Sequence, residues 1–418
     1  MRSFTPLRVF IRSVRSRGNR SYKPPAQFVQ DATTFADKHT VLNDPFSRLP
    51  YPPEQLTEHL NLSALEREAA RKSKFATRKQ QKEVNFDHID IEKQFVLMFP
   101  GQGSQFVGMG SSLVEHPKAR ELYEKANEIL GYNLQALSLE GPKSQLDQTI
   151  YCQPAIFVNS MAHIEKLRSE LEDFDDRITH AAGFSIGEFA ALVVGGVLSF
   201  EDGQFLSNLS VVPLKVIAVR ARTMHDCNQL VSSGMITVKT NAKSQLHEAM
   251  KEAREHAIEQ GESPLCDIAN YLYCGTVVVG ASKLCIKFLK QNAERCNFKV
   301  VKDLAVSGAF HTGLMQPAEK PLMDALHTVE IDVPKLNVYS NYTGKVYSRK
   351  KSEIRREIVK QLSNPVKWEQ IMQLIYRKHK DYRFPSFLEI GPGRQLGAIL
   401  VQVSKKAYAN YRSYGGQD

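Results

Sequence analysis

Short apolar runs alternate with amphipathic stretches from about residue 94 onward. The run FVLMF at 95–99 predicts a buried strand that leads into the glycine-rich turn PGQGSQ. Helical spacing of apolar positions follows at about 117–130 and 154–172, and RITHAAG at 177–183 predicts another strand ahead of the helix GEFAALVVGG. Strands that alternate with helices in this way indicate a mostly parallel sheet covered on both faces.

The middle of the chain follows a different order. Strands are predicted at 235–240, 266–272, 276–281 and 298–306, with helices at 242–260 and 282–295. This βαββαβ order is the split-βαβ pattern of a ferredoxin-like module. We therefore expect a small subdomain over 233–304, inserted into a large α/β subdomain that spans 94–232 and 305–412. The large subdomain ends with the strand PSFLEI, the turn GPG and a last helix.

The first 93 residues differ in composition from the rest. Residues 1–23 hold six Arg and one Lys, no acid, and scattered Ser and apolar residues. That composition is typical of a mitochondrial transit peptide, and a disordered basic arm is the alternative. Residues 24–93 predict a partly helical linker, because proline-containing turns interrupt its first half and a charged polar stretch follows.

Charge and hydropathy exclude several classes of protein. The net charge is +10, and the leader at 1–23 carries +7 of it, so the body lacks the basic character of a nucleic-acid-binding protein. The longest apolar stretch, at 190–198, is far shorter than the roughly 20 residues that cross a bilayer. The six cysteines form no CxxC pair, which disfavours a zinc site and a dense disulfide framework.

The motif Gly183-Phe184-Ser185-Ile186-Gly187 lies between a predicted strand and a predicted helix. In this context G-x-S-x-G is typical of a nucleophile turn, because the glycines permit the sharp change of direction that exposes the serine hydroxyl. The following helix N-terminus favours developing negative charge. The alternative is a serine that only caps the helix.

Three further positions are candidates for chemistry. His311 follows a predicted strand and could supply the base that a serine nucleophile needs, with a structural histidine as the alternative. The loop at 101–105 fails the dinucleotide fingerprint, because Phe106 occupies the third glycine position, but it could bring backbone N–H groups to a reacting oxygen. Arg220 lies at the edge of an apolar helical stripe and could reach into a cleft, with a solvated arginine as the alternative.

Taken in order, these motifs resemble the malonyl-CoA:acyl-carrier-protein transacylases, and in particular the stand-alone mitochondrial type. The likeness covers about residues 95–412. It rests on FPGQGSQFVGMG (99–110), QPA (153–155), GFSIGEFAAL (183–192), VRARTM (219–224), SGAFHTGLM (307–315), QLSNPVKW (361–368) and EIGPGRQLGAIL (389–400). The resemblance implies an α/β-hydrolase-like core. It also implies transfer of malonyl from malonyl-CoA to the phosphopantetheine thiol of acyl carrier protein in the mitochondrial matrix, with no metal ion and no cofactor besides the coenzyme A thioester substrate.

The resemblance assigns a catalytic role to five residues. Ser185 matches the nucleophile that carries the acyl group as an ester, and His311 matches its base. Gln361 matches the residue whose main-chain carbonyl orients that histidine. Gln102 and Ile186 match the two positions whose N–H groups form the oxyanion hole.

The resemblance also implies how the substrate and the partner are bound. Arg220 matches the arginine that binds the free malonyl carboxylate, Asn270 a residue lining the cleft, and Phe310 a pattern that goes with malonyl selectivity. The expected partner is an acidic carrier protein. Basic clusters such as 350–351, 355–356 and 377–380 could receive it, although solvated helix faces have the same composition.

One stretch departs from the family pattern, and two other functions remain open. About ten extra residues at 204–213 precede the helix that bears Arg220, and they are either a gene-model artefact, such as a retained intron, or a surface loop. A serine hydrolase would use the same Ser185 and His311 with a carboxylate such as Asp267 or Asp303. A third hypothesis is a non-catalytic interaction protein that has kept the fold.

Overall fold

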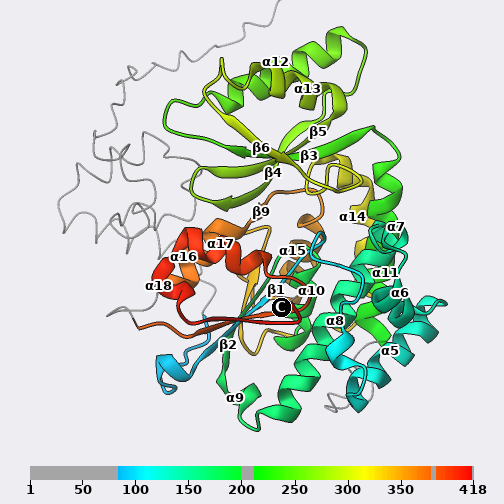
Figure 1. Cartoon of the computed structure of the whole chain (residues 1–418), viewed down its shortest axis with the longest axis vertical. Coiled ribbons are helices and arrows are strands. Elements are labelled where there is room, and N and C mark those ends of the chain that lie inside the picture. Colours follow the sequence, from blue (N-terminus) through cyan, green and yellow to red (C-terminus); the bar gives the residue numbers. More distant parts are fainter. Residues whose placement is uncertain (1–82, 199–210, 378–382, 417–418) are drawn as a thin grey trace, which may run out of the picture.

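The computed structural model of the chain describes residues 83–198, 211–377 and 383–416, which are arranged around two β-sheets (Figure 1). The predicted transit peptide at 1–23 and the predicted linker up to residue 82 lie outside the described residues, as does most of the 204–213 stretch. Within the described ranges, no helix combines the length and the apolar character that crossing a membrane requires.

The first sheet has the strand order β11-β10-β1-β2-β7-β8. Its strands are β1 (Phe95–Phe99), β2 (Ile178–Gly183), β7 (Asn337–Ser340), β8 (Lys345–Val346), β10 (Ser386–Ile390) and β11 (Tyr411–Tyr414). Every neighbouring pair is parallel except β7–β8, which confirms the predicted parallel sheet. Strand β1 is buried throughout, because its side chains alternate between two apolar cores on opposite faces.

Helices cover both faces of this sheet (Figure 1). One core joins β1 to α16 (Trp368–Arg377), α17 (Gln395–Val403) and α18 (Lys405–Tyr408). The larger core, on the other face, includes α5 (Pro117–Leu130), α6 (Leu134–Glu140), α7 (Lys143–Leu146), α8 (Thr149–Glu170), α9 (Phe174–Arg177), α10 (Gly187–Val194), α11 (Val211–Asn228), α14 (Glu319–His327) and α15 (Lys351–Lys360). Short 3-10 turns lie at η2 (Ile91–Lys93), η3 (Ser111–Leu113) and η4 (Gly313–Ala318). The sheet is therefore the middle layer of three.

The second sheet has the order β6-β3-β5-β4-β9 and lies above the first in Figure 1. Its strands are β3 (Ser233–Lys239), β4 (Cys266–Tyr273), β5 (Thr276–Ser282), β6 (Lys299–Asp303) and β9 (Val366–Lys367). Helices α12 (Leu246–Glu259) and α13 (Lys283–Asn292) pack with β3, β4 and β5 in a core of their own. The predicted βαββαβ order over 233–304 is confirmed. Strand β9 joins this sheet from outside that range, parallel to β4.

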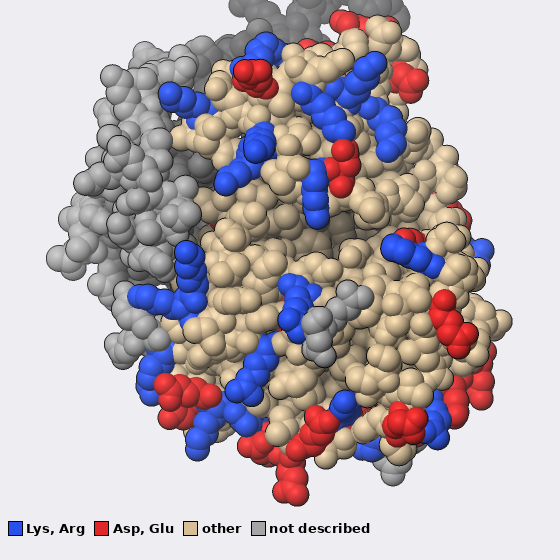
Figure 2. Space-filling model, in the orientation of Figure 1, with Lys and Arg blue, Asp and Glu red and all other residues tan. Residues whose placement is uncertain are grey.

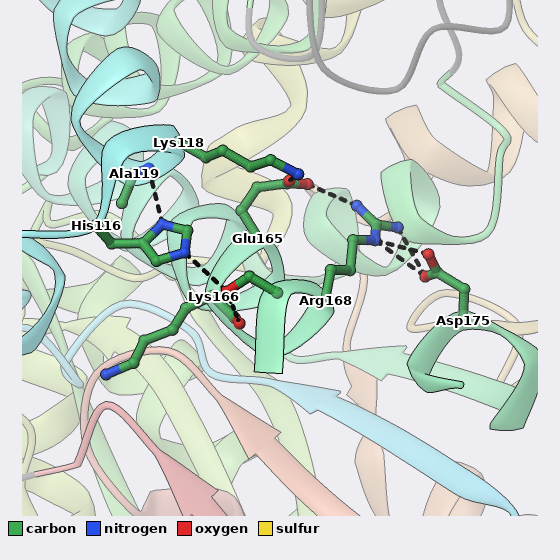
Figure 3. Close-up of polar contacts among 8 residues, drawn as sticks. His116, Lys118, Ala119, Glu165, Lys166, Arg168 and Asp175 are labelled. Atoms are coloured by element: carbon green, nitrogen blue, oxygen red, sulfur yellow. Dashed lines mark hydrogen bonds and ion pairs between the residues drawn. The ribbon is translucent and has the colours of Figure 1, made fainter. Parts of the chain in front are cut away.

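A buried carboxylate ties the ends of α5, α8 and α9 together (Figure 3). Glu165 of α8 is 1% exposed and accepts a 2.7 Å hydrogen bond from Arg168, whose guanidinium also binds Asp175 of α9. Lys118 of α5 lies 3.7 Å from the same carboxylate. His116 caps α5 and contacts the hydroxyl of Ser169 at 2.9 Å, so the layer beside the sheet is held by polar contacts as well as by apolar packing.

We predict that Glu165→Gln lowers the free energy of unfolding by about 3 kcal/mol, because it removes the buried carboxylate that pairs with Arg168. Glu121→Gln, which removes an exposed pair with Lys125 on α5, should cost less than about 0.5 kcal/mol. Chemical denaturation of both variants measures the difference. Equal and small losses would show that the Glu165 cluster does not stabilise the fold.

Candidate active site

Ser185 lies in the turn that connects β2 to α10. Its backbone has a φ of 55°, a left-handed conformation that non-glycine residues rarely adopt. Asn341 holds this conformation: its Oδ1 accepts from the Ser185 N–H at 2.8 Å and its Nδ2 donates to the Gly183 carbonyl at 2.7 Å. A Cβ on Gly187 would lie 2.2 Å from the Phe99 carbonyl oxygen, so the motif needs this glycine for the close approach of the turn to β1.

His311 comes from the segment that precedes η4 and reaches Ser185 across 126 positions of sequence. Its Nε2 lies 2.8 Å from Ser185 Oγ, and its Nδ1 lies 2.8 Å from the main-chain carbonyl oxygen of Gln361. Since a carbonyl oxygen only accepts, Nδ1 carries the proton and Nε2 accepts from the serine hydroxyl. His311 is also in the left-handed region, with a φ of 60°, and is 3% exposed.

Burial lowers the pKa of His311 to about 3, and the nearby positive charge of Arg220 acts in the same direction. The hydrogen bond to the Gln361 carbonyl opposes these two effects. The imidazole is therefore neutral, and able to accept a proton, over the whole physiological pH range.

Arg220 of α11 points into the same site and is fully buried. One Nη donates to Gln153 Oε1 at 2.6 Å, and the other donates to Gln361 Oε1 at 2.8 Å and to Ser185 Oγ at 3.1 Å. Burial lowers the pKa of Arg220 to about 9, so it still carries its charge at neutral pH. The alternative of a solvated arginine is wrong, because a cation sits directly beside the serine hydroxyl.

Comparison with protein families identifies the domain that holds this site. Residues 96–415 match the acyl transferase domain. The chain is 44% identical over 317 residues to the mitochondrial malonyl-CoA-acyl carrier protein transacylase of Homo sapiens, covering 76% of this chain and 78% of that protein. It is 39% identical to the probable mitochondrial malonyl-CoA-acyl carrier protein transacylase of Drosophila melanogaster, covering 76% of this chain and 82% of that protein. The chain belongs to the malonyl-CoA:acyl-carrier-protein transacylase family.

Solved transacylase structures have the same mixed α/β fold. The transacylase of Coxiella burnetii superposes with a TM-score of 0.66 at 26% identity, covering 78% of this chain and 95% of that one. A malonyl-transacylase in complex with a type II PKS acyl-carrier protein superposes with a TM-score of 0.65 at 27% identity. The match covers 78% of this chain and 96% of that one.

A buried acid, Glu188, lies close to Ser185 and contacts Gln361. The sequence pattern alone did not identify it. The side-chain amide of Gln361 donates to Ser185 O at 2.8 Å and to Glu188 Oε2 at 2.5 Å. Glu188 is fully buried, and its other oxygen accepts from the Asn341 N–H at 3.1 Å and from the Tyr347 hydroxyl. Burial raises the pKa of Glu188 to about 7. The available signal was an acid inside the otherwise apolar helix GEFAALVV.

The two predicted oxyanion positions lie on neighbouring turns. Gln102 follows β1, and Ile186 immediately precedes α10. A Cβ on Gly101 would lie 2.6 Å from the Phe184 carbonyl oxygen, so the two turns are in contact. The Gln102 side chain donates to Thr149 Oγ1 at 3.3 Å, which anchors its loop to α8.

Two further positions, Asn270 and Phe310, were predicted from the resemblance to contribute to substrate binding or selectivity. Asn270 is on β4, opposite Val366 of β9, and is 5% exposed. Its Oδ1 has no hydrogen-bond partner among the described residues, and no described hydrogen bond joins it to Ser185 or His311. Phe310 is buried in the larger core next to His311.

Neither carboxylate that a hydrolase triad would need contacts His311. Asp267 accepts from the Gly313 N–H at 3.2 Å, and Asp303 pairs with Lys290 at 2.7 Å. The ring nitrogen that a triad acid would bind is occupied by the Gln361 carbonyl. This geometry differs from the Ser-His-Asp arrangement of α/β-hydrolases.

We predict that kcat/KM for malonyl-CoA does not fall as pH decreases from about 7.5 to 5, because the free enzyme holds His311 neutral over that range. A histidine with its ordinary pKa would lose activity as pH falls through about 6.5. Stopped-flow measurement of coenzyme A release as a function of pH tests this. A fall centred near pH 6.5 would contradict the depressed pKa.

Proposed function

We propose that this protein transfers the malonyl group of malonyl-CoA to the phosphopantetheine thiol of acyl carrier protein through an ester on Ser185, and so supplies mitochondrial fatty acid synthesis. The reaction is ping-pong: coenzyme A leaves before the carrier protein attacks.

The observation that carries this proposal is the distance between the nucleophile and the guanidinium. Arg220 Nη2 lies 3.1 Å from Ser185 Oγ, in a site from which water is largely excluded. In a malonyl thioester, one methylene separates the reacting carbonyl carbon from the free carboxylate. An arginine this close to the hydroxyl therefore suits a short acyl chain that ends in a carboxylate, and planar Arg–carboxylate pairing is strong and directional.

In the first half-reaction, Ser185 Oγ attacks the thioester carbonyl carbon as its proton passes to His311 Nε2. Main-chain N–H groups of Gln102 and Ile186 stabilise the oxyanion, an effect worth about 3 kcal/mol for each donor. The tetrahedral intermediate collapses to the Ser185 ester, and the coenzyme A sulfur leaves with the proton from His311.

In the second half-reaction, His311 takes the proton of the carrier thiol, and the thiolate attacks the Ser185 ester. The intermediate expels the serine oxygen, which recovers its proton from His311. Transfer must compete with hydrolysis, and the low exposure of Ser185 (8%) and His311 (3%) restricts attack by water.

The substrate carboxylate also strengthens the base. The charge of Arg220 contributes to the low pKa of His311. A carboxylate bound to Arg220 offsets that charge, so the pKa of His311 rises when malonyl is bound. An acetyl group has no carboxylate and leaves the base weak, which adds to the cost of an unpaired guanidinium.

The finer organisation of the chain is part of the same proposal. A large α/β-hydrolase-like subdomain would comprise 94–232 and 305–412, and its support is the parallel sheet with Ser185 between β2 and α10. A ferredoxin-like subdomain would comprise 233–304, supported by the order β6-β3-β5-β4 with α12 and α13 in one core. Residues 1–23 would direct the enzyme to the mitochondrial matrix, in line with relatives named as mitochondrial.

The carrier protein would approach a surface with many cations. Lys and Arg side chains lie around a hollow on the face in Figure 2, above and below it, and acids are mostly at the edges of this view. Such a surface favours an acidic partner. The basic clusters at 350–351 and 355–356 are weaker candidates, because Lys350 and Lys351 pair with Glu353 and Asp332 and Arg355 donates to main-chain carbonyls.

We predict that Ser185→Ala abolishes covalent labelling of the protein by radiolabelled malonyl-CoA, because the ester has no other oxygen on which to form. The wild-type enzyme should retain the label through denaturation and lose it to carrier thiol. Mass spectrometry of the labelled peptide gives the site. A Ser185→Ala protein that still acquires label would end this proposal.

We predict that Arg220→Ala reduces the preference for malonyl-CoA over acetyl-CoA by at least about a hundredfold, as expected for loss of a buried ion pair. Arg222→Ala, an exposed position on the same helix, is the matched control and should leave the preference unchanged. The readout is the ratio of kcat/KM values for the two thioesters. An unchanged ratio in Arg220→Ala would reject carboxylate binding by this arginine.

A further inference from the structure

Two buried charges of opposite sign lie near Ser185 without touching each other. Arg220 and Glu188 are both fully buried, and the side-chain amide of Gln361 lies between them. Its Oε1 accepts from Arg220 Nη2 at 2.8 Å, and its Nε2 donates to Glu188 Oε2 at 2.5 Å. The amide therefore forms a bridge from the cation to the anion.

This separation resolves two opposing demands on the arginine. A buried guanidinium without any counter-charge is strongly destabilised. A carboxylate bound directly to it would stabilise the cation but would occupy the N–H groups that a substrate carboxylate needs. With the Gln361 amide between them, Glu188 supplies the negative charge without a direct contact to the guanidinium. Arg220 Nε therefore has no hydrogen-bond partner among the described residues.

Glu188 is fixed in position from several directions. Asn341 and Tyr347 donate to one of its oxygens and Gln361 donates to the other. The charged or titratable groups that face it are Arg220 from α11, Glu357 from α15, and Tyr347, which follows β8. Arg220 is the cation among them, so Glu188 is placed to balance its charge.

We infer that Glu188 is the counter-charge that holds Arg220 in the empty site and, acting through Gln361, limits how tightly the site binds a substrate carboxylate. This rests on the proposed function, because it assumes that Arg220 receives the malonyl carboxylate. Glu188 is a positioning residue that sets selectivity and touches no reacting atom. A substrate carboxylate gives the site a net negative charge, which keeps malonyl from binding so tightly that the acyl group cannot leave.

The test uses equilibrium binding in a protein that cannot turn over. In the Ser185→Ala enzyme, the ratio of the dissociation constant for acetyl-CoA to that for malonyl-CoA isolates the contribution of the carboxylate. At pH 8, where the Glu188 carboxyl is mostly ionised, adding Glu188→Gln removes a negative charge near the bound carboxylate and should increase this ratio about fivefold. A structural role for Glu188 predicts the opposite sign, since a loosened site would lower the ratio.

A matched control is available on β10. Glu389 is also fully buried and accepts from the N–H groups of Leu396 and Gly397, outside the site. Glu389→Gln in the same Ser185→Ala protein should leave the ratio unchanged. An unchanged or lowered ratio in the Glu188→Gln protein would overturn the inference. A ratio near one in the Ser185→Ala parent would instead count against the proposed carboxylate site itself.

A second variant keeps the inference testable if Glu188→Gln does not fold. Tyr347→Phe removes a hydrogen bond that lowers the pKa of Glu188, so the carboxyl is protonated up to a higher pH. The acetyl-to-malonyl ratio should then exceed that of the Ser185→Ala parent near pH 7, where the parent carboxyl is partly ionised. In both the Ser185→Ala parent and the protein that also carries Tyr347→Phe, the ratio should rise as pH falls from 8 to 6. Ratios that coincide and do not change with pH would overturn the inference.

Discussion

A buried guanidinium beside a serine hydroxyl is the constraint on which the rest of the site depends. Arg220 must remain charged to receive a carboxylate, yet no carboxylate among the described residues touches it. Four parts of the chain meet this requirement together. Helix α8 supplies Gln153, the turn into α10 supplies Ser185, α10 supplies Glu188, and the end of α15 leads into Gln361. The larger core fixes these elements relative to one another.

The second constraint concerns the base. His311 has a main-chain carbonyl where hydrolases place an acid, so no negative charge stabilises its protonated form. Together with burial and Arg220, this keeps the imidazole neutral in the empty site. The arrangement links proton transfer to substrate identity, because a carboxylate that neutralises Arg220 also makes His311 a better base.

The nucleophile turn and the order of the strands and helices could be predicted from the sequence, because the residue patterns that indicate them are local. The G-x-S-x-G turn requires glycines where it packs against itself and against the end of β1, and the βαββαβ order at 233–304 follows from hydrophobic periodicity. Glu188 and Asn341 could not be predicted, since their roles arise from contacts more than 150 positions apart. The same holds for β9, whose two residues pair with Asn270 and Tyr271 of β4, far earlier in the chain. The short strand has no periodicity of its own to reveal it.

The structure of the trapped malonyl-enzyme tests the central claim most directly. A crystal of the enzyme soaked with malonyl-CoA, in the absence of carrier protein, should hold an ester on Ser185 Oγ. We expect the free carboxylate to accept two hydrogen bonds from the guanidinium of Arg220, with His311 still bound to the Gln361 carbonyl. An ester whose carboxylate points to solvent, with Arg220 still on Gln153 and Gln361, would contradict the account.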